Sequence, residues 1–357
     1  MKFCFFGLSL TSSWGNGHAT TYRGLLAALR RLGHQIDFFE RDVEWYAARR
    51  DLPQPPQARL HLYREWSDIA ATALAMGQGA DAVVVGSYFP DSVALLDKLL
   101  VQRAAPVCFY DIDTPITLDD LRRQRCRYLR AEHIPEFDLY LSFTGGPVLE
   151  ELQSRWKARR VRTLYCACDE LSYLRTSKRA SSVPAVAKLS FMGTYAPDRQ
   201  AKLQTLFLEP ARLLPQHHFA MAGSMYPAPC NWPENVRYQS HLAPGSHAAF
   251  YSASEFTLNL TRQAMVEAGY SPSIRLFEAA SCGTAVISDP WPGLDEFFEP
   301  GAEILVANDS DAVVDILSHA TPADAERIGN AARERVLSAH TSRHRAVSLL
   351  SYFDEIT

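Results

Sequence analysis

The sequence lacks several features that mark particular classes of protein. No stretch of 18 or more apolar residues is present, so no membrane-spanning helix is predicted. The formal net charge is −4 at pH 7, without the basic excess that is typical of nucleic-acid-binding proteins. The opening apolar run, residues 3–8, is too short for a signal peptide and leads directly into a polar segment. We therefore expect a cytoplasmic protein with no nucleic-acid partner.

Cysteine is sparse and scattered, with seven in 357 residues. An odd number without a dense framework is typical of reduced thiols in the cytoplasm. Cys166 and Cys168 stand too close together for a zinc knuckle, and no second Cys/His pair completes a site. We interpret them as small buried residues at the end of a strand, and we predict no metal site.

Short β-branched or aromatic runs alternate with longer helical patterns along the whole chain. Most of the runs are apolar throughout, which is typical of parallel strands covered on both faces. At 47% hydrophobic residues the chain can fill two cores. The predicted strands are 2–8, 35–40, 82–87, 107–111, 139–143 and 162–165 in the first half, then 188–193, 218–223, 236–239, 256–260, 285–288 and 303–307.

A polar stretch, 176–183, separates these two halves and predicts a linker. We therefore expect an α/β protein of two Rossmann-like, doubly wound domains, residues 1–175 and 184–340, that face each other across a cleft. Ligands bind such sheets at the carboxyl ends of the strands, so the cleft is the expected active site.

The strongest motif is residues 271–289, which read SPSIRLFEAASCGTAVISD. Ser271 suits a helix N-cap and Pro272 the first helical position, while Gly283 ends the helix just before a buried strand. The start of a helix offers free backbone N–H groups and a partial positive charge. The segment therefore predicts a short helix that begins at a site for a diphosphate.

Two side chains of this helix extend the hypothesis to a whole nucleotide. Arg275 adds a full positive charge near the helix start. Glu278 lies about six residues into the predicted helix, roughly 9 Å along the axis from its start, which is about the reach from a terminal phosphate to a ribose. A carboxylate suits the two hydroxyls of a ribose. The alternative is an ordinary helix in which Arg275 and Glu278 pair with each other.

The pattern S-P-S-x-R-x-F-E-A-x-x-C-G-T followed by a strand resembles the donor-binding motif of GT-B glycosyltransferases. More narrowly it resembles the CgeB-like branch, named for a spore maturation protein. The resemblance implies transfer of a sugar from a nucleoside-diphosphate sugar without a metal or other cofactor. It implies that Glu278 holds the ribose, that Ser271 and Ser273 face the diphosphate, and that a C-terminal helix in 341–357 crosses back to the first domain. Tyr270 stands where many retaining enzymes carry a first glutamate, so the resemblance does not settle retention or inversion.

Further donor-binding candidates follow two other predicted strands of the second half. Gly193 and Thr194 lie in a loop that approaches the diphosphate in GT-B proteins, where glycine permits close backbone contact. Arg199, just beyond, and Arg262, after another strand, are candidate phosphate ligands. The alternative for either arginine is a solvated surface position.

The first half offers a candidate loop after its first strand. Gly15, Asn16 and Gly17 resemble the Gly-rich loop that reaches the cleft in GT-B enzymes, whereas Thr20 breaks the dinucleotide-binding fingerprint. His18 is a candidate general base for an acceptor hydroxyl, because histidine titrates near neutral pH. The alternative is a structural histidine.

Asp111 and Asp113 follow another strand of the first half and provide a second candidate for the acceptor side. CgeB-like proteins show a similar D-x-D-T-P segment. The short D-x-D also occurs as the metal motif of the GT-A fold, but the two-half layout argues against that fold. We expect an acceptor-side role for Asp111 and a general-base role for Asp113, with a turn cap before Pro115 as the alternative.

Several questions stay open at this stage. A nucleotide-sugar epimerase on the same fold and a non-catalytic nucleotide-sugar-binding protein are the alternatives to a transferase. The sequence does not name the sugar, the base or the oligomeric state. The acceptor is equally open among a glycan, a lipid-linked glycan, a protein and a small molecule, and a lipid-linked acceptor would imply peripheral contact with the inner membrane face.

Overall fold

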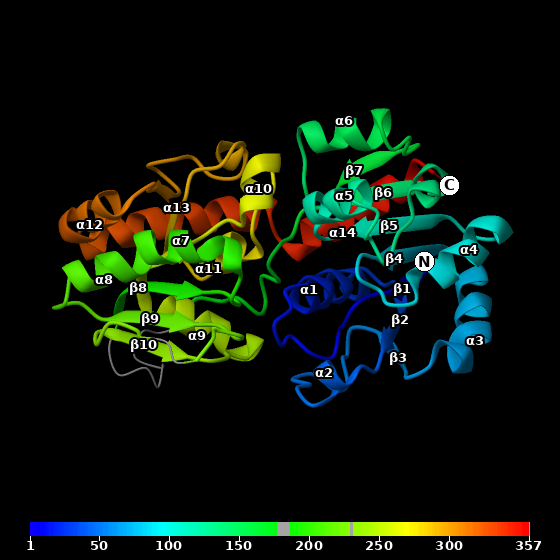
Figure 1. The fold of residues 1–357 in the computed structure, drawn as a ribbon, viewed down its shortest axis with the longest axis horizontal. Helices are drawn as coiled ribbons and strands as arrows, with labels where there is room; N and C mark the ends of the chain where they lie inside the picture. Colours follow the sequence, from blue (N-terminus) through cyan, green and yellow to red (C-terminus); the bar gives the residue numbers. More distant parts are fainter. Residues whose placement is uncertain (177–185, 229–230, 357) are drawn as a thin grey trace. The chain divides into compact units, whose positions relative to one another are not determined.

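The computed structural model describes residues 1–176, 186–228 and 231–356. Contacts within the chain divide it into two compact units, drawn in Figure 1: unit 1 is Met1–Cys166 with Ser342–Thr357, and unit 2 is Ala167–Thr341. The predicted linker lies outside the described residues except for Thr176.

Unit 1 is built on a seven-stranded parallel sheet in the order β3-β2-β1-β4-β5-β6-β7. Its strands are β1 (Lys2–Phe6), β2 (Gln35–Arg41), β3 (Arg59–Tyr63), β4 (Ala82–Gly86), β5 (Val107–Asp111), β6 (Leu139–Ser142) and β7 (Val161–Thr163). Its helices are α1 (His18–Arg31), α2 (Glu44–Ala47), α3 (Trp66–Gln78), α4 (Ser92–Gln102), α5 (Thr114–Arg122), α6 (Pro147–Ser154) and α14 (Ser342–Asp354).

The last helix of the chain, α14, packs in unit 1, although the residues just before it belong to unit 2. The rings of Phe3 and Phe353 lie 5.4 Å apart, which joins α14 to β1 in the core. The Tyr352 hydroxyl donates to the backbone oxygen of Thr163 at 3.1 Å, at the end of β7. Apolar and polar contacts thus both hold this helix in unit 1.

Unit 2 has a six-stranded parallel sheet in the order β10-β9-β8-β11-β12-β13. Its strands are β8 (Ala187–Met192), β9 (Phe219–Ala222), β10 (Val236–Gln239), β11 (Ser254–Asn259), β12 (Ala285–Ser288) and β13 (Leu305–Val306). Its helices are α7 (Gln200–Leu203), α8 (Glu209–Leu213), α9 (His247–Ser252), α10 (Gln263–Ala268), α11 (Ile274–Ser281), α12 (Ser310–His319) and α13 (Pro322–Ala339).

Each sheet starts in its middle and is then wound in both directions. In unit 1 the chain reverses between β1 and β4, and in unit 2 between β8 and β11. The prediction of two Rossmann-like, doubly wound parallel domains is confirmed. Loops at such a reversal splay apart at the carboxyl ends of the strands and leave room for a ligand there.

Strand β3 is absent from the predicted set. It is one of the two edge strands of the unit 1 sheet. Most of its residues are only partly buried, and its sequence Arg-Leu-His-Leu-Tyr alternates between polar and apolar residues. A search for continuous apolar runs detects strands covered on both faces and misses an edge strand of this kind. Among the described residues, no helix is both long and apolar enough to cross a membrane.

Candidate functional site

In unit 1 the loop between β1 and α1 is held by a buried carboxylate. Glu40, at the end of β2, is fully buried. It accepts the backbone N–H groups of Leu10 and Thr11 at 2.6 and 3.0 Å, and the hydroxyls of Ser9 and Thr11 at 3.0 and 2.6 Å. Four hydrogen bonds to one carboxylate fix the loop in a single position. No local pattern in the sequence predicts this role for Glu40.

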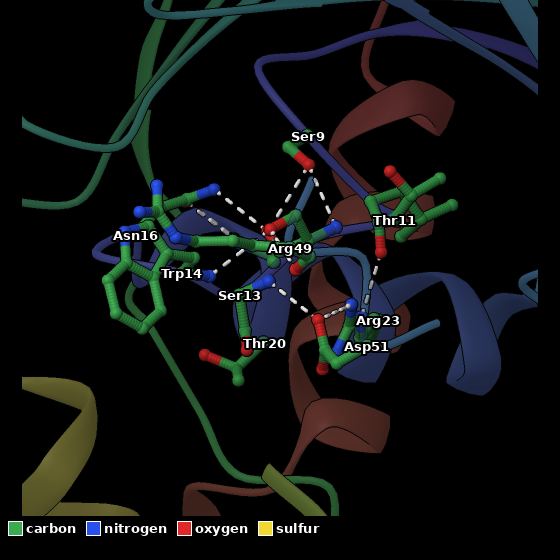
Figure 2. Close-up of polar contacts among 12 residues, drawn as sticks. Ser9, Thr11, Ser13, Trp14, Asn16, Thr20, Arg23, Arg49 and Asp51 are labelled. Atoms are coloured by element: carbon green, nitrogen blue, oxygen red, sulfur yellow. Dashed lines mark hydrogen bonds and ion pairs between the residues drawn. The ribbon is translucent and has the colours of Figure 1, made fainter. Parts of the chain in front are cut away.

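A second carboxylate holds the same loop farther along, as Figure 2 shows. Asp51 accepts the backbone N–H of Ser13 at 2.8 Å and pairs with two nitrogens of Arg23 at 2.7 and 3.1 Å. Burial acts to raise the pKa of Asp51, but the bond and charge of Arg23 and the Ser13 N–H outweigh it, so the pKa is lowered. The loop is therefore preorganised by charge-assisted hydrogen bonds.

Gly15, Asn16 and Gly17 form the turn that leads into α1. Gly15 has φ +63°, in the left-handed region that favours glycine. The Asn16 side-chain oxygen accepts the backbone N–H groups of His18 and Ala19 at 2.8 and 3.3 Å. Its amide donates to the backbone oxygen of Ser12 at 3.1 Å. The Asn16 side chain therefore bonds to the backbone of its own loop and to the first N–H groups of α1.

The two predicted catalytic residues of the first half lie together. His18, at the start of α1, is 7% exposed, and its Nε2 lies 3.5 Å from a carboxylate oxygen of Asp113. Its Nδ1 is buried and has no hydrogen-bonding partner among the described residues. The edge of the ring meets Tyr88, whose φ of +63° is unusual for a tyrosine. An imidazole beside a carboxylate is an arrangement suited to proton transfer.

Asp111 and Asp113 have different surroundings although one residue separates them. Asp111 is fully buried and accepts the hydroxyls of Thr117 and Tyr140, each at 2.6 Å. Burial raises its pKa to about 6. The Asp113 side chain is 28% exposed at the edge of the turn. The structure thus places Asp111 inside the β5–α5 turn and Asp113 where another molecule can reach it.

In unit 2, Arg275 is fixed across the carboxyl ends of β8 and β11. Its Nε donates to the backbone oxygen of Met192, and its Nη1 donates to the side-chain oxygens of Asn259 and Ser273 at 3.3 and 3.2 Å. The guanidinium also stacks on the Phe191 ring, 5.4 Å from the ring centre. These contacts hold a positive charge at the edge of the sheet.

The predicted start of helix α11 is wrong by two residues. The N-cap is Ser273, not Ser271, and Pro272 lies before the helix. Gly269 and Tyr270 both have positive φ, and the Tyr270 N–H donates to the backbone oxygen of Pro292 at 2.7 Å. This turn keeps the chain extended until Ser273. Ser271 is buried, with its hydroxyl 3.4 Å from the Met265 sulfur.

Three arginines of unit 2 gather in one region. The Arg199 guanidinium donates to the backbone oxygen of Thr194, and burial lowers the Arg199 pKa to about 10, with the charges of Arg275 and Arg262 adding to the effect. Arg262 pairs with Asp198 at 3.2 Å. Arginines that act on each other in this way mark a region of concentrated positive charge.

Gly193 has no side chain and so leaves space for Arg275, one of these three arginines. A Cβ at this position would lie 2.9 Å from Phe191 and 3.1 Å from the Arg275 guanidinium. A side chain here would therefore force the Phe191 ring to shift and would crowd the Arg275 guanidinium. Close approach of the Gly193 backbone to a phosphate stays a prediction, and in the structure the Arg275 guanidinium lies next to this glycine.

Glu278 is only 3% exposed. Its carboxylate accepts the Tyr173 hydroxyl at 2.6 Å and the Tyr251 hydroxyl at 3.3 Å, and the His247 Nδ1 lies 4.0 Å away. Burial and the Glu278 carboxylate raise the pKa of both tyrosines well above the usual range, so they stay protonated donors. Sequence reasoning missed these three partners, because they come from separate segments with no shared motif.

The structure also gives the surroundings of the cysteines. Cys166 and Cys168 are buried thiols. In the part of the chain that the structure describes, no group of three or more His, Cys, Asp or Glu side chains is placed to hold a metal ion.

Similarity to known proteins extends over both units. Residues 199–351, which include Arg199, Arg262, Arg275 and Glu278, match a family model described as "Glycosyl transferase-like". A search of curated proteins found no match. Solved structures that are similar over nearly the whole chain include the three described next.

Sucrose-phosphate synthase from Thermosynechococcus elongatus has a TM-score of 0.73 at 16% identity, covering 100% of this chain and 99% of its own. HepE from Anabaena, in complex with UDP and glucose, has a TM-score of 0.71 at 12% identity, covering 99% and 100%. An α-glucosyltransferase, in complex with UDP-glucose and DNA containing an abasic site, has a TM-score of 0.74 at 14% identity, covering 99% of each chain. The chain therefore has the two-domain α/β fold of the GT-B glycosyltransferases, and the narrower CgeB-like resemblance stays a prediction.

Proposed function

We propose that this chain is a glycosyltransferase that moves a sugar from a nucleoside-diphosphate sugar to an acceptor hydroxyl. The observation that carries the proposal is the cluster of Arg199, Arg262 and Arg275 at the carboxyl edge of the unit 2 sheet, beside the start of α11. In a doubly wound sheet this edge is where ligands bind. Guanidinium groups and free helix N–H groups are the partners that a diphosphate requires.

The charge of the cluster suits a diphosphate leaving group. Of the three arginines, Arg262 is balanced by Asp198, whereas Arg199 and Arg275 donate to backbone oxygens that carry no full charge. As the bond between the sugar and the diphosphate breaks, negative charge grows on the phosphate oxygens. Fixed positive groups stabilise that charge. We propose that they do so in place of a metal ion.

The ribose end of the donor is assigned to Glu278, whose carboxylate is the acidic group on α11. HepE and the α-glucosyltransferase were solved with UDP or UDP-glucose, and starch synthase IV from Arabidopsis thaliana with ADP and acarbose. These proteins share the fold with this chain, and their ligands support a nucleoside diphosphate as the class. They differ in the base, so the proposal names no base and no sugar.

We assign the acceptor side to unit 1. His18 accepts the proton of the acceptor hydroxyl while that oxygen forms its bond to the anomeric carbon, and the bond from this carbon to the diphosphate breaks. Asp113, 3.5 Å from the His18 Nε2, stabilises the imidazolium that results. The loop that carries His18 is preorganised by Glu40 and Asp51, which keeps the base in place.

Calorimetric titration with UDP, ADP, GDP and dTDP in the presence of EDTA tests the donor site. We expect one nucleoside diphosphate to bind, and Arg275→Gln to weaken it by about 10- to 100-fold, the range for loss of a charge-assisted hydrogen bond. Arg212→Gln, an exposed arginine of the same unit, is the matched control and should bind as the wild type does. Equal affinities for both variants, or no binding at all, would refute the donor site.

Turnover tests the reaction itself. With the nucleotide known, its sugar derivatives are incubated with acceptor panels, and release of the nucleoside diphosphate is measured. His18→Asn should lower kcat by about 10²- to 10⁴-fold while nucleotide affinity stays unchanged, since His18 belongs to the acceptor side. Conversion of the donor to another nucleotide sugar without any acceptor would show an epimerase instead.

A further inference from the structure

We propose that Tyr173 competes with the ribose of the donor for the Glu278 carboxylate and so sets the nucleotide affinity of the site. The inference rests on the proposed function and names a residue that controls its specificity. The Tyr173 hydroxyl donates to Glu278 Oε1 at 2.6 Å, and the carboxylate is 3% exposed. Because the carboxylate is this deeply buried, we infer that a ribose diol reaches it by taking the place of a hydroxyl already bound to it.

Two tyrosines bond to Glu278, and the structure distinguishes them. Tyr251 lies in α9, is fully buried, and its hydroxyl is the more distant, at 3.3 Å from Oε2. Its backbone oxygen accepts the Thr284 hydroxyl at 2.7 Å, which ties it to the start of β12. Tyr173 lies in an irregular segment and is 6% exposed. Tyr173 is thus the donor that can be displaced with less disturbance of the core.

The backbone around Tyr173 is anchored, so the displacement involves the side chain. The Ser281 hydroxyl donates to the Tyr173 backbone oxygen at 2.9 Å. Arg175, two residues on, donates to the backbone oxygens of Cys282 and Gly283 at 3.3 and 3.0 Å. Rotation of the Tyr173 side chain about a fixed backbone changes the partner of one hydroxyl and leaves the segment in place.

His247 offers the displaced hydroxyl a second acceptor. Its Nδ1 lies 3.1 Å from the Tyr173 hydroxyl, and its Nε2 lies 3.1 Å from the backbone oxygen of Leu242. Because a carbonyl oxygen only accepts, we assign the proton of the neutral ring to Nε2, which leaves Nδ1 as an acceptor. The Tyr173 hydroxyl lies between two acceptors and has one proton. When a ribose hydroxyl takes its place on Glu278, that proton still has a partner in His247.

Tyr173→Phe removes only the hydroxyl and tests the competition in the full-length chain. We expect the nucleoside diphosphate that binds the wild type to bind this variant about tenfold more tightly. We also expect a larger preference for the ribonucleotide over its 2′-deoxy analogue, since the diol then meets a Glu278 carboxylate whose Oε1 no longer accepts the Tyr173 hydroxyl. Tyr352→Phe, which removes a hydroxyl from unit 1, is the control and should change neither value.

His247→Leu is an independent test, in which we expect nucleotide affinity to change in the opposite direction from Tyr173→Phe. It removes the second acceptor, so Tyr173 should stay on Glu278 and nucleotide binding should weaken by about three- to tenfold. The proposal is overturned if Tyr173→Phe binds the nucleotide as the wild type does or more weakly, or if His247→Leu binds it more tightly. If neither the wild type nor Tyr173→Phe binds any nucleoside diphosphate, the proposed function fails and this inference fails with it.

Discussion

The buried carboxylate of Glu40 should be essential for the stability of unit 1 and for the shape of its candidate site. Replacing Glu40 with Ala removes the acceptor of two backbone N–H groups and two hydroxyls. The hydroxyls can turn toward other acceptors, but the N–H groups of Leu10 and Thr11 cannot. Each buried donor left without a partner costs about 1–3 kcal/mol, so Glu40→Ala should destabilise the chain by about 3–5 kcal/mol.

The isosteric variant Glu40→Gln should cost less, and the geometry gives the reason. One carboxylate oxygen, Oε2, takes both backbone N–H groups, while Oε1 takes the hydroxyls of Ser9 and Thr11. A glutamine can keep its carbonyl oxygen toward the backbone and turn its amide toward the hydroxyls, which also accept hydrogen bonds. Glu40→Gln then loses only the extra strength that the negative charge gives these hydrogen bonds, and we expect its stability to fall by about 1–2 kcal/mol.

Hydrogen exchange of the Leu10 and Thr11 amides, together with urea unfolding at pH 7, measures these effects. We expect faster exchange and lower stability in the order wild type, Glu40→Gln, Glu40→Ala. Glu44→Gln, an exposed glutamate that follows the same strand, is the control and should stay within about 0.5 kcal/mol of the wild type. A Glu40→Ala variant as stable and as well protected as this control would refute the reasoning.

Two further substitutions test other parts of the structure. A Cβ at Gly223 would overlap the backbone carbonyl of Gly193, so Gly223→Ala should destabilise unit 2 by about 1–3 kcal/mol or more in urea unfolding; an unchanged midpoint would contradict the packing described. Burial raises the pKa of the Asp111 carboxyl from 3.8 to about 6, so the folded chain binds the carboxyl proton more tightly than the unfolded chain does. The protonated carboxyl therefore contributes stability below about pH 4, and this contribution is lost as the pH rises through about 6. Asp111→Asn should remove this loss, up to about 3 kcal/mol, and parallel stability–pH curves for variant and wild type would show that Asp111 does not titrate in this way.

Much of the fold follows from local patterns in the sequence. Continuous apolar runs such as the one in β4 predict parallel strands covered on both faces, because such a strand has no polar side to show. This criterion misses edge strand β3, since most of its residues are only partly buried. The start of α11 was misplaced for a related reason: Ser271 and Ser273 are equally good caps, and the turn at Gly269 and Tyr270 selects the second.

The candidate functional site likewise has features that local sequence patterns predict and features that only tertiary packing sets. The sequence by itself determined that His18, Asp113 and Arg275 stand at or near the starts of helices, because turns and helix starts depend on local backbone chemistry. Only the tertiary structure decided that His18 lies beside Asp113, and that Glu278 accepts the hydroxyls of Tyr173 and Tyr251. A buried polar group must find its partner wherever the packing brings one, and that partner can stand anywhere along the chain.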